Sequence, residues 1–143
     1  MDKALDIARY IINHENNKHR SITNLRLQKL LYFCQGAVIT KTNGELCFEE
    51  DIEAWTYGPV VPCVYKEFCS YYFFDIPSEG NAITPKYKEV IDSTLDEAAR
   101  MSTSTLVDIS HCQTPWAKTY SEGKKKVIEK SLLIDYFKKK ANR

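Results

Sequence analysis

Long apolar runs, clustered glycines and paired cysteines are all missing from this sequence. The longest apolar stretches, such as residues 30–34, are far too short to cross a bilayer. The N-terminus begins Met1-Asp2-Lys3 and lacks the apolar core of a signal peptide. We therefore expect a cytoplasmic protein that does not interact with a membrane.

The rare residue types also exclude several kinds of site. The glycines stand too far apart to build a phosphate-binding loop: Gly36, Gly44, Gly58, Gly80 and Gly123. Five cysteines form an odd set without a CxxC pair, which favours reduced, structural thiols over a disulfide framework. Three histidines are scattered without the short ligand spacings of zinc sites. We expect no metal site and no cofactor.

What remains is the composition of an ordinary globular protein. The chain has 143 residues, of which 43% are apolar and 27% are charged, so it can bury one core without a partner. We expect residues 1–143 to form a single, compact, mainly α-helical domain of several helices with a small β-hairpin or strand element around residues 46–56.

Charge is unevenly distributed along the chain, although the net charge is only +1. Residues 1–43 carry seven Lys/Arg and three Asp/Glu, residues 44–97 carry three and twelve, and residues 124–143 carry eight and two. Such asymmetry can steer a charged partner. The alternative is that these charges lie on ordinary solvent-exposed faces of helices.

Apolar residues at helical spacing predict the first two helices. A stripe over residues 3–14 ends in a polar run at residues 14–17. Thr23 is a candidate N-cap for a second, central helix whose face carries Leu27, Leu30, Leu31, Cys34 and Val38. Gly36 costs this helix about 1 kcal/mol of propensity, which predicts that another backbone approaches closely there.

From residue 46 the period changes to alternation, which predicts the strand or hairpin and its end at residues 57–62. Pro62 suits the first turn of the next helix. Further helix starts are predicted where candidate caps precede apolar stripes: at Thr84-Pro85, at residues 102–104, at Thr114-Pro115 and at Ser131.

Two other functions, a Cys/His hydrolase and a nucleic-acid-binding protein, have some support in the sequence. Cys112 beside His111 suggests a Cys/His hydrolase, but neighbouring helix residues point about 100° apart, so adjacency does not make a catalytic pair. The basic clusters at residues 124–126 and at residues 138–140 with Arg143 could neutralise phosphates, but the acidic middle segment would repel a nucleic acid. We therefore favour a protein that is not an enzyme and does not bind nucleic acid.

Aromatic residues beside prolines form the most informative pattern. Trp55 and Tyr57 lie within eight positions of Gly58, Pro59 and Pro62, and a second group comprises His111, Pro115 and Trp116. Rigid aromatic surfaces of this kind are typical of protein interfaces. The alternative is that each Trp belongs to the core, with its ring N–H bonded to a partner.

Three blocks of sequence resemble one known family. They are Ile22-Thr23-Asn24-Leu25-Arg26-Leu27-Gln28-Lys29-Leu30-Leu31-Tyr32-Phe33, Ile52-Glu53-Ala54-Trp55-Thr56-Tyr57-Gly58-Pro59-Val60-Val61-Pro62-Cys63-Val64-Tyr65 and Leu106-Val107-Asp108-Ile109-Ser110-His111-Cys112-Gln113-Thr114-Pro115-Trp116. Their order and spacing resemble the Panacea domain family, which includes SocA-like antitoxins and GepA-like phage-associated proteins. The resemblance spans essentially the whole chain.

The resemblance implies an antitoxin, often carried on a prophage, that neutralises a cognate protein toxin encoded by an adjacent gene. In the SocA-like branch the antitoxin is also a proteolytic adaptor that delivers the toxin to the ClpXP protease. No catalytic residues carry over from the family. We expect toxin binding through these contact residues: Trp55, Tyr57, Tyr65, His111 and Trp116.

Overall fold

A computed structural model describes residues 1–141, which contain seven α-helices, one 3₁₀ turn and a three-stranded antiparallel sheet. The helices are α1 (Ala4–Asn17), α2 (Asn24–Thr42), α3 (Pro62–Phe68), α4 (Lys88–Ala98), α5 (Thr103–Cys112), α6 (Thr114–Thr119) and α7 (Lys130–Ala141), and the 3₁₀ turn is η1 (Cys69–Tyr71). The strands are β1 (Glu53–Trp55), β2 (Gly58–Val60) and β3 (Lys126–Val127). The predicted mainly helical fold with a small β element is confirmed.

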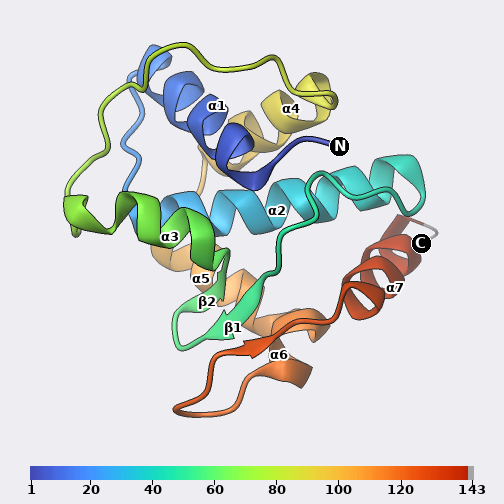
Figure 1. The fold of residues 1–143 in the computed structure, drawn as a ribbon. Coiled ribbons are helices and arrows are strands. Elements are labelled where there is room, and N and C mark those ends of the chain that lie inside the picture. Colours follow the sequence, from blue (N-terminus) through green and yellow to red (C-terminus); the bar gives the residue numbers. More distant parts are fainter. Residues whose placement is uncertain (142–143) are drawn as a thin grey trace.

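Helix α2 runs through the middle of the molecule, with α1 and α4 on one side and the sheet, α6 and α7 on the other (Figure 1). Its start is fixed by Thr23, whose hydroxyl accepts a hydrogen bond from the Arg26 amide at 3.2 Å, as predicted. It ends at Asn43, which adopts a left-handed conformation with φ of 58°. The predicted apolar face of this helix is buried. No helix among residues 1–141 combines the length and apolarity needed to span a membrane.

Gly36 is the closest contact point of α2, although the approaching group differs from the prediction. A Cβ atom at this position would lie 2.4–2.8 Å from three ring atoms of Phe137 on α7. The neighbour is therefore an aromatic side chain and not a second backbone. The ring sits directly on the helix because glycine has no side chain there.

The hairpin lies further along the chain than predicted. Strand β1 pairs with β2 from Glu53 opposite Val60 to Trp55 opposite Gly58, and β3 pairs with the other edge of β1. Strand β1 lies within the predicted range of residues 46–56, but residues 46–52 belong to none of the three strands, and β2 lies in residues 57–62, where the element was predicted to end. Residues 46–52 are held by other contacts: the Gln35 side chain accepts hydrogen bonds from the amides of Cys47 and Phe48 at 2.7 and 3.2 Å.

The predicted helix starts are confirmed where a local cap or a first-turn proline determines the start. Ser102 caps α5 by accepting from the Thr105 amide at 3.1 Å, and Pro62 stands in the first turn of α3. The start at Thr84-Pro85 is wrong, because α4 begins at Lys88. Pro85 is buried and the next amide donates to the Asp2 carboxylate at 2.8 Å, so this part of the chain is fixed against the N-terminus. The cap predicted at Thr114 is one residue late and that at Ser131 is two residues late, because α6 begins at Thr114 and α7 at Lys130.

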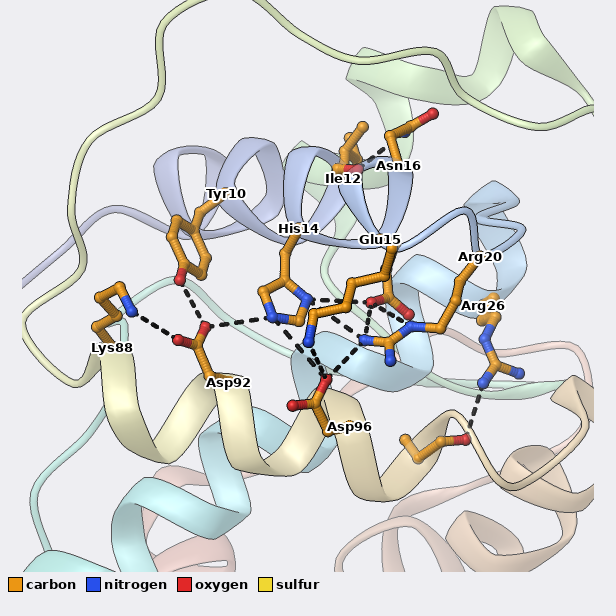
Figure 2. Close-up of polar contacts among 12 residues, drawn as sticks. Tyr10, Ile12, His14, Glu15, Asn16, Arg20, Arg26, Lys88, Asp92 and Asp96 are labelled. Atoms are coloured by element: carbon orange, nitrogen blue, oxygen red, sulfur yellow. Dashed lines mark hydrogen bonds and ion pairs between the residues drawn. The ribbon is translucent and has the colours of Figure 1, made fainter.

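An ion cluster around one buried carboxylate joins α1 to α4. Helix α1 ends at Asn17, within the polar run at residues 14–17 where its end was predicted, and the carboxylate of Glu15 in this run is fully buried. Figure 2 shows Arg20 between two carboxylates, with its Nη2 at 2.6 Å from Glu15 and 2.9 Å from Asp96. His14 lies 3.2 Å from Glu15 and 3.6 Å from Asp92 of α4. The hydrogen bond from Arg20 holds the pKa of Asp96 below its ordinary value.

Candidate functional site

Three of the five predicted contact residues come together around one groove. Trp55 ends β1, Tyr57 lies in the hairpin turn and Tyr65 projects from α3. The Trp55 and Tyr65 rings meet edge to face, with their centroids 4.9 Å apart. Tyr57 is 68% exposed, so its ring is free to contact a partner. Pairs of this geometry make a rigid aromatic surface.

We call this feature the aromatic groove, and its volume is about 880 Å³. It is lined by Thr23, Asn24, Leu25, Gln28, Lys29, Trp55, Thr56, Tyr57, Val60, Tyr65, Cys69, Tyr72, Phe73, Thr103, Gly123, Lys124 and Lys125. Its walls are mostly apolar, and three lysines but no aspartate or glutamate among residues 1–141 line it. The volume lies within the range of small-molecule binding pockets.

The other two predicted residues lie outside the groove. His111 of α5 stacks on Trp116 of α6 with ring centroids 3.9 Å apart, and Tyr120 stacks against the same indole at 4.5 Å. The Trp116 ring N–H donates to the Trp55 carbonyl oxygen at 2.8 Å. The two aromatic blocks of the sequence therefore meet, but the second block packs behind the hairpin and supports it.

Side chains of α2 fasten the hairpin and α3 in place. Gln28 accepts a hydrogen bond from the Val61 amide at 2.9 Å and donates to Asn24 at 2.9 Å. Asn24 donates in turn to the Tyr65 carbonyl oxygen at 3.1 Å. These groups are buried and bonded, which keeps the groove walls at fixed positions.

Lys29 is the unusual residue at this site, and the sequence reasoning missed it. Its side chain is fully buried, and its Nζ donates to the Pro59 carbonyl oxygen at 2.8 Å. Burial lowers the pKa of Lys29 from 10.5 to about 7. Gly58 makes room for it, because a Cβ there would lie 2.9 Å from the lysine Cε. The available signal was a polar residue inside a helix predicted to be central.

Cys112, the candidate nucleophile, gains no partner from the fold. Its side chain is exposed on α5, and no hydrogen bond among residues 1–141 joins a cysteine to a histidine. The His111 Nε2 atom is buried without a hydrogen-bond partner, inside the stack with Trp116. The arrangement is that of a packed imidazole beside an exposed thiol, and the chemistry favours a structural role for the ring.

A helical scaffold that presents a rigid aromatic groove is typical of the class of binding proteins. Residues 27–117 match the family model described as "Antitoxin SocA-like, Panacea domain". Because this match covers more than half of the chain, the chain belongs to the SocA-like Panacea domain family of antitoxins. The groove residues Lys29, Trp55, Tyr57 and Tyr65 all fall within the matched region.

A curated relative supports the same family. The chain is 36% identical over 110 residues to "Antitoxin SocA" of Caulobacter vibrioides, which covers 66% of this chain and 58% of that protein. The chain thus spans less than two thirds of its relative's length. No solved structure matches the chain.

Proposed function

We propose that this chain is an antitoxin that binds a cognate protein toxin in the cytoplasm and blocks it through the aromatic groove. The observation that carries the proposal is a set of exposed aromatic side chains around the groove. Tyr57, Tyr72 and Phe73 are 68%, 74% and 79% exposed. Aromatic side chains in such positions have no folding role that requires exposure, and they are the residues that dominate binding energy in interfaces.

The support from the family is the shared antitoxin description, which implies a toxin as the partner. The support from the structure is the rigid support behind the groove, where Trp116 and Gln28 hold its walls by hydrogen bonds. A wall that is ordered before binding loses less entropy on association, so it is suited to tight, stoichiometric inhibition.

Co-expression with the protein encoded by the neighbouring gene tests the proposal. We expect that protein to arrest growth alone, and we expect this chain to restore growth and to copurify with it. Tyr57→Ala and Phe73→Ala are each expected to weaken the complex about tenfold or more, since both remove contact area without disturbing the core.

Ile83→Ala is the matched control, because Ile83 is an exposed apolar residue that does not line the groove. It is expected to leave affinity and growth rescue unchanged. A toxic neighbour that this chain neither binds nor silences would contradict the proposal. If Tyr57→Ala and Phe73→Ala change the affinity for the toxin no more than Ile83→Ala does, the toxin contact lies elsewhere on the surface.

The resemblance to SocA-like antitoxins supports a second, separable step, in which the chain delivers its bound toxin to a ClpXP-type protease. This step predicts that the chain shortens the half-life of the toxin in cells that contain the protease and leaves it unchanged in cells that lack it. A toxin that is neutralised but equally long-lived in both backgrounds would restrict the function to direct binding.

A further inference from the structure

The charge of the aromatic groove differs from that of the sequence around it. Residues 44–97, which supply the hairpin and α3, carry twelve Asp/Glu and three Lys/Arg. Yet the charged residues that line the groove are Lys29, Lys124 and Lys125. A ligand in the groove therefore meets positive charge at close range, while a long polyanion would also meet the acidic surface outside it.

Lys125 is held against the wall of the groove in the free chain. The Lys125 Nζ lies 4.1 Å from the centroid of the Trp55 ring, which is the geometry of a cation–π contact. Trp55 also donates from its ring N–H to the Glu53 carboxylate at 2.8 Å, so the indole is fixed on both sides. An ammonium group held over an aromatic wall can donate hydrogen bonds to a carboxylate that enters the groove.

Lys29 brings a third amine to the groove from below. An ammonium group has three N–H donors, and one of them is used by the Pro59 carbonyl oxygen. No ion pair among residues 1–141 includes Lys29. A buried amine without a carboxylate is unfavourable for folding, and a leucine or methionine would fill the same space at lower cost. The unfavourable free energy of burying this amine indicates a binding role for the side chain.

A partner cannot bind at the groove by pairing its backbone with the sheet. The outer edge of β2 is already covered, because Lys29 bonds to the Pro59 carbonyl and Gln28 to the Val61 amide. A partner segment therefore cannot add a strand at this edge, and its side chains must supply the recognition.

We infer that the occupant of the aromatic groove is an acidic segment of the partner protein, whose carboxylates are met by Lys29, Lys124 and Lys125 while its apolar side chains contact the aromatic walls. The inference rests on the proposed function and adds the chemistry of the toxin epitope. Since Lys29 has no exposed surface in the free chain, a direct contact requires a local movement of the hairpin residues Gly58 and Pro59, which lie against its side chain. A carboxylate can then replace Pro59 as the acceptor.

Peptide binding to the complete chain tests this inference. The probes are fluorescein-labelled 15-residue peptides that tile the neighbouring gene's product, each made in its natural form and with Asp and Glu replaced by Asn and Gln. We expect one acidic peptide to bind, and its amide form to bind about tenfold or more weakly. Lys29→Met and Lys125→Met are expected to weaken the natural peptide and to leave the amide form unchanged.

Lys126→Met is the control, because Lys126 is an exposed neighbour that does not line the groove. The same three variants are measured against the intact toxin, so the test does not depend on a peptide binding alone. Equal binding of the natural and amide peptides, equal effects of the Lys29 and Lys126 substitutions on the intact toxin, or stronger binding of a dT12 oligonucleotide overturns the inference. If the toxin forms a complex but its carboxylates do not matter, the inference fails and the proposed function stands. If no complex forms, the proposed function itself fails.

Discussion

The Lys29 ammonium gives up its hydration for one hydrogen bond to a backbone carbonyl. Its charged form is therefore less favourable in the folded chain than in the unfolded chain, which is the reason that its pKa falls to about 7. Between pH 7 and 10.5 the unfolded chain holds this proton more firmly than the folded chain does. Folding stability contributed by this site therefore increases as the pH rises through that window.

Replacing the lysine tests this linkage. Lys29→Met is expected to increase the free energy of unfolding at pH 7 by a few kcal/mol, because the cost of burying the amine is removed. The advantage is expected to shrink as the pH approaches 10, by at most about 1.4 kcal/mol per pH unit. Urea unfolding of both proteins at pH 6.5, 8 and 9.5 measures the difference, in which other titrating groups cancel. A stability difference that does not change with pH would contradict the burial of a charged group at this position.

Arg20 differs from Lys29, because its charge is paired with a buried carboxylate and stabilises the fold. Glu15 is fully buried and receives hydrogen bonds from the Arg20 Nε and Nη2 atoms at 3.0 and 2.6 Å. Arg20→Met would leave this carboxylate without its cation, and we expect a loss of about 3–5 kcal/mol in the free energy of unfolding. Urea unfolding at neutral pH provides the measurement.

Lys18 offers a matched comparison at the same cluster. Its Nζ lies 3.8 Å from the carboxylate of Asp96, which Arg20 also binds, but the Lys18 side chain is 50% exposed. Exposed pairs of this kind contribute little, so Lys18→Met is expected to change stability by less than about 1 kcal/mol. Similar losses for the two variants would mean that the cluster acts through its net charge and not through the burial of Glu15.

At the scale of elements, one aromatic ring of α7 packs directly on the backbone of α2. Phe137 lies over Gly36, where an added Cβ would fall 2.4 Å from the ring Cζ atom. Gly36→Ala is therefore expected to destabilise the chain by about 1–3 kcal/mol, because the ring and the helix that carries it must move. The helix propensity of alanine would by itself give a gain of about 1 kcal/mol, so the sign of the effect decides between packing and propensity.

A double-mutant cycle assigns the effect to this contact. Phe137→Leu alone removes ring contacts and is expected to destabilise the chain. In the Phe137→Leu background, Gly36→Ala is expected to be neutral or stabilising, since the smaller side chain leaves room for the new methyl group. Urea unfolding of the four proteins gives the coupling energy. Additive changes would show that the close approach at Gly36 does not hold α7 in place.

The elements that could be predicted are those determined by local sequence. Thr23 and Ser102 act as caps because their hydroxyl groups bond to amides three residues later, which is a short-range property. The hairpin was placed too early because the alternation over residues 46–52 matches contacts with the Gln35 side chain and the core, not a neighbouring strand. Periodicity records which residues are buried, but it does not identify what covers them.

The same distinction applies to the candidate site. The aromatic blocks were visible in the sequence because Trp and Tyr beside prolines are unusual in composition. Their division into a groove wall at Trp55 and a supporting stack at Trp116 depends on the contact between β1 and α6, which no local pattern encodes. Lys29 was not predicted because its burial follows from α3, α5 and the hairpin packing around α2.

At the scale of the whole molecule, the two lysine runs that look equivalent in sequence have different surroundings. Lys124 and Lys125 line the aromatic groove, whereas residues 138–140 form the last turn of α7. Cations in a final helical turn are stabilised by the partial negative charge of the helix end, so they need no ligand to explain them. The fold thus separates basic residues suited to binding from basic residues that stabilise a helix.

One hydrophobic core connects these surfaces, and its two buried thiols can report on how it opens. Cys34 lies on α2 and Cys47 lies in the connection that follows α2, and both belong to the same buried cluster. Burial raises the pKa of the Cys34 thiol well above its ordinary value and that of Cys47 to about 12. Three further thiols are exposed: Cys63, Cys69 and Cys112.

Ellman's reagent should therefore label this chain in two stages. We expect three thiols to react in the native protein and the remaining two to react only as the core opens, because a buried, protonated thiol is a poor nucleophile. If the core opens as one unit, Cys34 and Cys47 will share the same opening free energy, and both rates will rise with urea along the slope of global unfolding. Cys47→Ala assigns the two slow phases. Rapid labelling of Cys47 at a rate independent of urea would show that residues 43–52 open separately, and that the Gln35 hydrogen bonds do not bind this connection to the core.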